Sequence, residues 1–239
     1  MSDSPWLTST RPLIIGHRGA SADAPENTPA AFALALEQNA DGIEFDVQLC
    51  ADGVAVVMHD DTVDRTCDGT GRVADLTLAD LRLMTIENEH VVPTLDEVFE
   101  LLGREALYNV ELKMGGDGER LAAVVARSVG AHGLGDRALI SSFSPLVVRQ
   151  ARRHLPASVP VGHLRERRLT RLAHLLVHAE ADHPDHALVD EALMEWARGR
   201  DLRVNVWTVD DPIEAGRLIR LGVHGLITNR PAALRPLVG

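Results

Sequence analysis

The sequence predicts an α/β protein in which parallel strands alternate with helices. Short runs rich in β-branched residues are separated by segments of helical periodicity, which is the pattern of consecutive βα units. A chain of 239 residues has the usual length of one eight-unit barrel. Strands are expected at eight places: 12–17, 42–48, 107–113, 138–143, 160–164, 183–188, 203–208 and 225–228. We therefore expect a TIM (β/α)8 barrel that forms a single domain over residues 1–239.

The first unit shows how these elements are assigned. The apolar run 12–17 ends in a His-Arg-Gly turn, and helical periodicity begins again at 28–40. Asn27 and Thr28 precede that periodicity and are suitable helix caps. Further helices are expected at 119–133 and 211–222. The segment 183–188 has the poorest apolar content of the expected strands.

One extra run, residues 54–60, does not fit the alternation. It follows the second strand after three residues, too few for a parallel crossover of about a dozen residues. Asp52-Gly53 is a hairpin signal, so this run should fold back antiparallel on the second strand. His59 would then lie near the level of Glu44 and Asp46. The turn-rich stretch 61–92 that follows is expected to be a small insertion over the barrel mouth.

Composition limits the classes of partner. The net charge of -11 argues against nucleic acid or an anionic membrane as the main partner. The N-terminal residues lack the pattern of a signal peptide, and no apolar run approaches the roughly 18 residues of a membrane span. Cys50 and Cys67 form no disulfide framework and are expected to be free thiols. We expect a cytoplasmic protein without stable membrane insertion; the oligomeric state is not indicated.

Three carboxylates are expected to converge inside the barrel. Glu44 and Asp46 are two residues apart on one strand, so both side chains project from the same face. Glu111 comes from the next barrel strand at a similar height. Three oxygen donors without a nearby cysteine are typical of a hard cation, Mg²⁺ or Ca²⁺. The alternative is a set of buried salt bridges to Arg18 and Lys113.

His17 and His59 are the histidines expected beside these carboxylates. Histidine is the usual proton-transfer group near neutral pH. Taken singly, each would more often be a structural histidine, but the carboxylates favour a catalytic pair. His174 and His178 have the spacing of a zinc pair on a predicted helix, but the sequence shows no third ligand for them.

Lys113 is the only lysine among 24 lysine and arginine residues. A lysine ammonium is a compact charge on a flexible stem, whereas an arginine guanidinium is a rigid planar fork. A point charge suits one phosphate oxygen beside a metal carboxylate. The alternative is chance retention in a composition biased toward arginine.

The motifs GHRGASADAPENTPAAF, ADGIEFDVQLCADGVAVVMHDDTVDRTCDGTG, LYNVELK, ISSF, NVWTVDDP and GVHGLITNRP resemble those of the glycerophosphodiester phosphodiesterase family. They occur in the family's order from about residue 12 to residue 235. The resemblance implies a TIM barrel with a small insertion after the His-Asp motif. It also implies one divalent cation, Mg²⁺ or Ca²⁺, and hydrolysis of a small-molecule glycerophosphodiester to sn-glycerol 3-phosphate and an alcohol.

The resemblance also implies roles for individual residues. The substrate hydroxyl next to the phosphoester would attack phosphorus, with His17 as base and His59 as acid, and a cyclic phosphate would then be opened by water. The other matched positions are the metal ligands Glu44, Asp46 and Glu111, the phosphate contacts Arg18 and Lys113, and the pocket residues Phe143 and Trp207.

Three positions depart from the usual family pattern. His224 stands where an aspartate is common, Asn229 also replaces a common aspartate, and Asp210 replaces a frequent asparagine. The last two could be a compensated exchange, since one carboxylate and one amide remain. These departures concern substrate preference rather than the class of reaction.

Two other functions are compatible with this fold. A lysophospholipase D would act on lysolipid headgroups, but the insertion is polar and poor in aromatic residues, which favours small soluble diesters. A non-catalytic binding barrel would be expected to lack a histidine or a metal ligand, and every matched position is retained.

Overall fold

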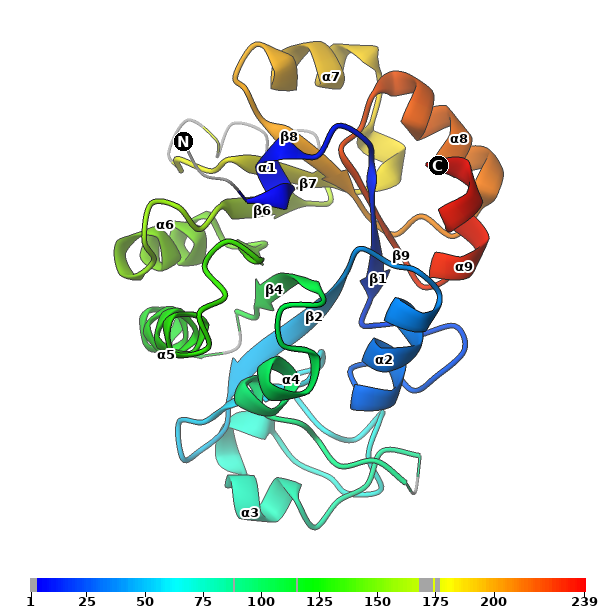
Figure 1. Cartoon of the computed structure of the whole chain (residues 1–239). Coiled ribbons are helices and arrows are strands. Elements are labelled where there is room, and N and C mark those ends of the chain that lie inside the picture. Colours follow the sequence, from blue (N-terminus) through cyan, green and yellow to red (C-terminus); the bar gives the residue numbers. More distant parts are fainter. Residues whose placement is uncertain (1–3, 88, 115, 168–173, 175–176) are drawn as a thin grey trace.

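The protein is a closed barrel of parallel strands surrounded by helices (Figure 1). This computed structural model describes residues 4–87, 89–114, 116–167, 174 and 177–239. Its sheet runs in the order β1-β9-β8-β7-β6-β5-β4-β2-β3, and β1 also pairs with β2, which closes the barrel. The eight strands of the ring are β1 (Leu13–His17), β2 (Gly42–Leu49), β4 (Leu107–Leu112), β5 (Ala138–Ser142), β6 (Val161–Arg165), β7 (Ala181–Pro184), β8 (Arg203–Val206) and β9 (Gly225–Thr228). The predicted fold class is therefore confirmed.

The seventh strand of the ring lies earlier than expected. The prediction of 183–188 is wrong in its bounds, because β7 ends at Pro184 and residues His186–Leu188 form a 3-10 turn. Asp185 terminates the strand, since its side chain accepts a hydrogen bond of 2.9 Å from the backbone N–H of Ala187. The predicted strand began too late because Asp182 and His183 are polar residues, which do not mark a buried strand in the sequence, yet both are fully buried.

The predicted hairpin is confirmed. β3 (Ala55–Val57) pairs antiparallel with β2 in the register Val47 to Val57. β4 pairs with one edge of β2. On the other edge, β1 pairs with residues 42–44 of β2, and β3 pairs with residues 47–49. The backbone N–H of Met58 then bonds to the carbonyl of Asp46 over 3.1 Å, which brings His59 to the end of the barrel where β1 ends.

The described helices are α1 (Pro5–Thr8), α2 (Pro29–Glu37), α3 (Leu78–Leu81), α4 (Leu95–Leu102), α5 (Gly118–Ala131), α6 (Pro145–His154), α7 (Glu191–Arg198), α8 (Pro212–Leu221) and α9 (Pro231–Leu234), with further 3-10 turns at Val73–Asp75 and Arg235–Leu237. Most of the helices cover the outside of the ring, while α1 lies at the end where the strands begin and α3 lies in the stretch 61–92. Thr28 caps α2 through its side chain, as expected, while Thr94 forms a reciprocal capping box with Glu97 at α4. The helix predicted around His174 and His178 lies mostly outside the described residues.

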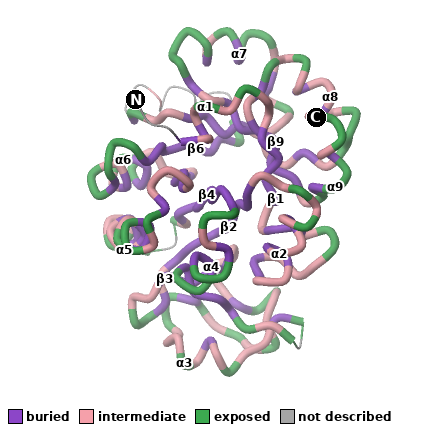
Figure 2. Tube along the Cα trace, viewed as in Figure 1, coloured by how far each residue is buried: buried purple, intermediate pink, exposed green. Residues whose placement is uncertain are grey.

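Alternate residues of the strands build the core. Those facing inward at one end of the barrel pack around Trp6 of α1, which is fully buried and donates from Nε1 to the carbonyl of Arg137 over 2.8 Å. α1 therefore closes the end of the barrel at which the strands begin. Residues facing outward pack under the helices, and Figure 2 shows burial following the strands and exposure along the outer sides of α5, α6 and α7.

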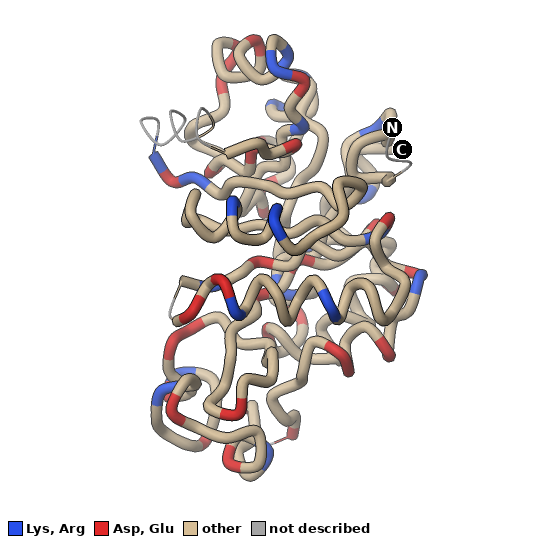
Figure 3. Tube along the Cα trace, turned by 90° about the vertical axis from the view of Figure 1, so that its left-hand side faces the viewer, with Lys and Arg blue, Asp and Glu red and all other residues tan. Residues whose placement is uncertain are grey.

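The stretch 61–92 has a small apolar cluster of its own. Val63, Val73, Leu81, Ile86 and Val92 pack there together with residues of the β2–β3 hairpin. Figure 3 shows acidic and basic positions interspersed over one side of the molecule. Among the described residues, no helix combines the length and the apolar character that crossing a membrane requires.

Candidate active site

The expected carboxylates do converge at the open end of the barrel. Register places Asp46 of β2 directly beside Glu111 of β4, and His17 of β1 directly beside Glu44 of β2. One oxygen from each of Glu44, Asp46 and Glu111 lies within 4.8 Å of the others, and all three residues are buried. This set is called the acidic cluster below.

The electrostatics of the acidic cluster are those of crowded negative charge. Burial, followed by repulsion from Asp46 and Glu111, raises the pKa of Glu44 well above its usual value. Burial and Asp46 together raise the pKa of Glu111 to about 7. Burial also opposes ionisation of Asp46, but Lys113 and Arg18 outweigh it and lower the pKa of that carboxyl.

Two cations contact the acidic cluster. Arg18 Nε lies 3.4 Å from Asp46 Oδ2, and Lys113 Nζ lies 3.2 Å from Asp46 Oδ1 and 3.0 Å from Glu111 Oε1. Arg18 is shared, because its Nη1 also lies 3.0 Å from Glu26 Oε1. Both expected salt bridges are thus present, yet three carboxylates face two cations.

The acidic cluster fits a hard divalent cation. Its donors are all carboxylate oxygens, and the raised pKa values of Glu44 and Glu111 show that added positive charge would stabilise their ionised forms. Asn27 lies next to them, where its Nδ2 donates to Asp46 Oδ2 over 2.9 Å and its buried Oδ1 has no partner among the described residues. The expectation that Asn27 is a cap is therefore wrong: Thr28 alone caps α2.

The turn after β1 positions Arg18 over the acidic cluster. Arg18 has a positive φ of 55°, and its backbone N–H donates to the carbonyl of Glu44 over 2.8 Å and to Glu44 Oε2 over 3.1 Å. Gly19 follows with φ of 86°, and a Cβ there would lie 2.5 Å from the backbone of Ala31. Only glycine fits this turn.

His17 stands beside the acidic cluster at the end of β1. Its Nε2 lies 3.9 Å from Glu44 Oε2, and its Nδ1 lies 2.7 Å from Asn229 Oδ1. Burial and then the charge of Arg18 lower the pKa of His17 below its usual value. The ring is therefore neutral near pH 7, the form in which a histidine can accept a proton.

His59 comes from the hairpin and has a different partner. Its Nδ1 lies 2.5 Å from Asp60 Oδ1, and Asp60 is in turn held by Arg65, whose Nε lies 2.5 Å from Asp60 Oδ2. Arg65 also lies 2.7 Å from Glu26, so the network returns to the first loop. The sequence analysis missed Glu26, Asp60 and Arg65, although Glu26 lies in the first of the quoted motifs and the other two lie in the second.

A single cavity joins these groups. It has a volume of about 110 Å³ and brings together the two histidines, Arg18 and two members of the acidic cluster. Phe143 and Trp207 line its other wall, with ring centroids 5.3 Å apart and planes at 89°. Lys113 contacts the acidic cluster but does not line this cavity. The residues lining the cavity are His17, Arg18, Glu44, His59, Glu111, Phe143, Leu164, Glu166, Trp207 and Ile227.

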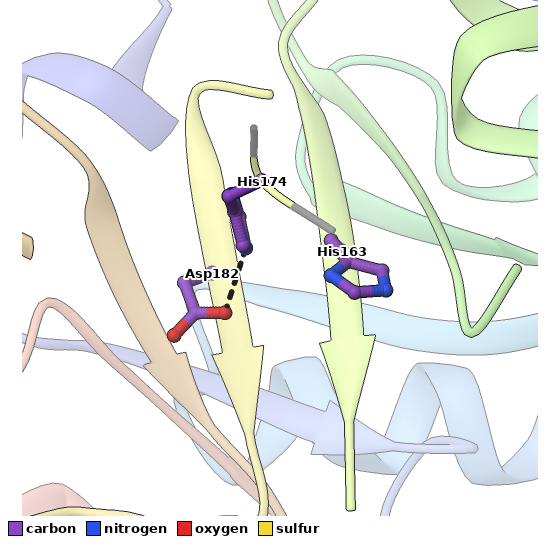
Figure 4. A group of neighbouring side chains, drawn as sticks. All are labelled: His163, His174 and Asp182. Carbon is purple, nitrogen blue, oxygen red and sulfur yellow. Dashed lines mark hydrogen bonds and ion pairs between the residues drawn. The ribbon is translucent and has the colours of Figure 1, made fainter. Parts of the chain in front are cut away.

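A second cluster of potential ligands lies on the outer face of the strands. Figure 4 shows His163 of β6, Asp182 of β7 and His174 close together. His174 Nε2 lies 3.0 Å from Asp182 Oδ1. Arg165 donates to both oxygens of the same carboxylate, from Nε to Oδ1 over 2.6 Å and from Nη2 to Oδ2 over 2.5 Å. Burial raises the pKa of Asp182, yet Arg165 and His174 outweigh it and hold that pKa at about 2. The charge of Asp182 is thus already balanced by Arg165, unlike that of the acidic cluster.

The three departures from the family pattern fall in two places. His224 lies where β8 and β9 begin, away from the cavity, and its Nδ1 accepts from the backbone N–H of Val204 over 2.9 Å. Asn229 and Asp210 lie beside His17 and contact each other, with Asn229 Nδ2 at 2.6 Å from Asp210 Oδ2. The exchanged amide and carboxylate are therefore partners in space.

Known proteins of one family are similar to this chain over most of its length. The family model for the glycerophosphoryl diester phosphodiesterase family matches residues 17–233. A glycerophosphodiester phosphodiesterase of Caldanaerobacter subterraneus is 37% identical over 241 residues, which covers 95% of this chain and 97% of that protein. One from Bacillus subtilis is 31% identical and covers 94% of this chain and 86% of that protein.

Solved structures show the same fold. An Oleispira antarctica phosphodiesterase in complex with the product sn-glycerol-3-phosphate superposes with a TM-score of 0.86 at 28% identity, covering 95% of this chain and 97% of that one. A glycerophosphodiester phosphodiesterase from Agrobacterium tumefaciens has a TM-score of 0.82 at 29% identity, covering 94% of this chain and 99% of that one. By sequence and by structure, this chain belongs to the glycerophosphoryl diester phosphodiesterase family.

Proposed function

We propose that this chain hydrolyses soluble glycerophosphodiesters to sn-glycerol 3-phosphate and an alcohol, with a divalent cation and two histidines as the catalytic groups. The observation that carries this proposal is the convergence of His17, His59 and the acidic cluster on one cavity. The Oleispira relative, which holds sn-glycerol-3-phosphate as its product, supports the same reaction.

The residues of the cavity have separate tasks in this reaction. Glu44, Asp46 and Glu111 would hold Mg²⁺ or Ca²⁺, which when bound supplies positive charge to the phosphoryl oxygens. Arg18 adds a fixed cation at the same place. His17 accepts the proton of the substrate hydroxyl next to the phosphoester, because its ring is neutral and its Nε2 is not used by Asn229. That hydroxyl then attacks phosphorus.

His59 donates the proton that the departing alcohol needs. It lies on the hairpin, and its Nδ1 is held by Asp60, which leaves Nε2 for the substrate. Water afterwards opens the cyclic phosphate, with the two histidines in reversed roles. The aromatic pair Phe143 and Trp207 forms the wall on which the alcohol portion would lie.

Purified protein offered soluble glycerophosphodiesters and lysophospholipids in parallel would test the proposal. We expect sn-glycerol 3-phosphate from the soluble diesters only, loss of activity in chelator, and recovery with Mg²⁺ or Ca²⁺. Faster turnover of lysophospholipids would identify a lysophospholipase D instead. Full activity in metal-free protein would remove the proposed role of the acidic cluster.

A further inference from the structure

Three side chains form a chain of hydrogen bonds that ends on His17. Asp210, on the loop after β8, accepts a bond from Asn229 Nδ2 over 2.6 Å. Asn229, on the loop after β9, presents its Oδ1 to His17 Nδ1 at 2.7 Å. These hydrogen bonds therefore connect the ends of three strands, β8, β9 and β1.

The chemistry of these groups fixes the direction of each bond. A carboxylate accepts and cannot donate, so the amide nitrogen of Asn229 must face Asp210. The amide oxygen must then face His17, and because that oxygen only accepts, Nδ1 of His17 must carry the hydrogen. Nε2 of the neutral ring is left with its lone pair, on the side where Glu44 Oε2 lies 3.9 Å away.

Asp210 is itself held in place by the neighbouring backbone. Its Oδ1 accepts from Thr228 Oγ1 over 2.9 Å and from the backbone N–H of Asn229 over 2.8 Å. Ser21 Oγ adds a contact of 2.7 Å to Asn229 Oδ1 from the first loop. Within the described residues, each polar atom of the Asn229 side chain thus has a specified partner.

We propose that Asp210 and Asn229 are a positioning pair that holds His17 in the tautomer with hydrogen on Nδ1 and the base at Nε2. This inference rests on the proposed function in treating His17 as the base. It gives Asp210 a role through its neighbour: among the described residues its hydrogen bonds go to Thr228 and Asn229, and it acts by setting which way the Asn229 amide faces.

The pair has a property that distinguishes positioning from simple packing. If carboxylate and amide exchanged places, the carboxylate at position 229 would accept from His17 Nδ1, and the amide at position 210 would donate to it. The oxygen of that amide would still accept from Thr228 and from the backbone of residue 229. The double exchange thus preserves every donor and acceptor match, whereas either single change breaks one.

The single variants should fail in different ways. In Asp210→Asn, two amide nitrogens would face each other unless the Asn229 side chain turned over. A turned amide would present its nitrogen to His17, and the hydrogen of the ring would move to Nε2. In Asn229→Asp, two carboxylates would face each other and repel.

The experiment is a double-mutant cycle with two readouts on the metal-loaded protein. The first is kcat and KM for one soluble glycerophosphodiester. The second is the tautomer of His17, read from nitrogen-15 NMR of histidine-labelled protein and assigned by the signal lost in His17→Gln. Asp211→Asn is the matched control, since Asp211 is a neighbouring carboxylate that caps α8 and asparagine caps equally well.

We expect Asp210→Asn to lower kcat at least tenfold with little change in KM, and to shift His17 toward the Nε2–H tautomer. Asp210→Asn combined with Asn229→Asp should recover kcat to within about threefold and restore the tautomer. Asp211→Asn should change neither readout. An unchanged tautomer and kcat in Asp210→Asn would overturn the proposal, as would a folded double variant without rescue. If His17→Ala kept full activity, the proposed role of His17 would fall, while the NMR readout would still test the positioning.

Discussion

Lys113 donates a hydrogen bond from Nζ to Asp46 Oδ1 over 3.2 Å, within the acidic cluster. The same ammonium lies 3.0 Å from Glu111 Oε1. The only lysine of the chain is thus placed between two buried carboxylates, where a compact charge serves both.

Lys113→Arg should therefore be damaging although it conserves charge. A planar guanidinium cannot occupy the point between Asp46 and Glu111 without displacing one of them. We expect kcat/KM to fall at least tenfold, or about 1.4 kcal/mol of transition-state stabilisation. Steady-state kinetics would measure it. Arg104→Lys, in the exposed ion pair with Asp136, is the control and should leave kcat/KM unchanged. Wild-type kinetics in Lys113→Arg as well would mean that the lone lysine is an accident of composition.

Glu44→Gln should weaken metal binding while the barrel stays folded. The change replaces one of three candidate carboxylate ligands by a neutral amide, and it also removes a buried carboxyl whose charge is unfavourable there. We expect metal affinity to fall at least tenfold by titration calorimetry, with a Tm no lower than that of the wild type in metal-free buffer. Glu37→Gln, on the exposed end of α2, serves as control. Equal affinities in the two variants would exclude Glu44 as a ligand.

Stabilisation by metal should depend on pH. The pKa of Glu111 is raised to about 7, so a proton competes with the metal for this carboxylate below that pH. In the metal-free protein, the folded state binds the Glu111 proton more tightly than the unfolded state does. The free energy of unfolding is therefore highest below the ordinary glutamate pKa, and this contribution is lost as pH rises through about 7. The rise in Tm on adding Mg²⁺ should accordingly be small near pH 5.5 and largest near pH 8. A shift that is flat across this range would contradict the assignment.

The nucleophile should be the substrate hydroxyl. Among the described residues that line the cavity there is no serine, threonine or cysteine. A diester lacking the hydroxyl next to the phosphoester should therefore bind as a competitive inhibitor without being cleaved. His17→Ala and His59→Ala should each lose activity while still binding metal. Rapid cleavage of the deoxy diester would indicate attack by water in place of the hydroxyl.

The sequence predicted those parts of the structure that depend on local periodicity. Residues two apart on a strand share a face, which correctly brought Glu44 and Asp46 together, and the Asp52-Gly53 turn correctly placed the hairpin. It failed at β7, because the fully buried Asp182 is stabilised by Arg165 from the neighbouring strand. Such partners are fixed by strand register, which a single strand's composition does not reveal.

The same reason explains the missed contacts around the site. Asn27 donates to Asp46 across 19 residues of sequence, and Asn229 meets His17 across 212. Neither pair follows from spacing, since each joins a side chain on a loop to a residue on a neighbouring strand. Contacts between neighbouring strands could be predicted, as for Glu111 beside Asp46, whereas contacts from loops to strands required the closed ring.

Because β3 lies outside the closed ring, the two histidines are attached to parts of the fold that differ in stability. His17 is carried by a strand whose removal would break the ring, whereas His59 follows a three-residue strand attached along one edge of β2. Ala55 and Val57 of β3 pack into the main core, whereas Met58 and the stretch 61–92 pack in a separate apolar cluster, so residues 58–92 can detach as a subglobal unit. On heating, such detachment would leave a barrel with native-like circular dichroism but no acid beside the base. We expect inactivation to precede global melting, and amide hydrogen exchange at Val63 and Val73 to run ahead of exchange at Ile14 and Ile15.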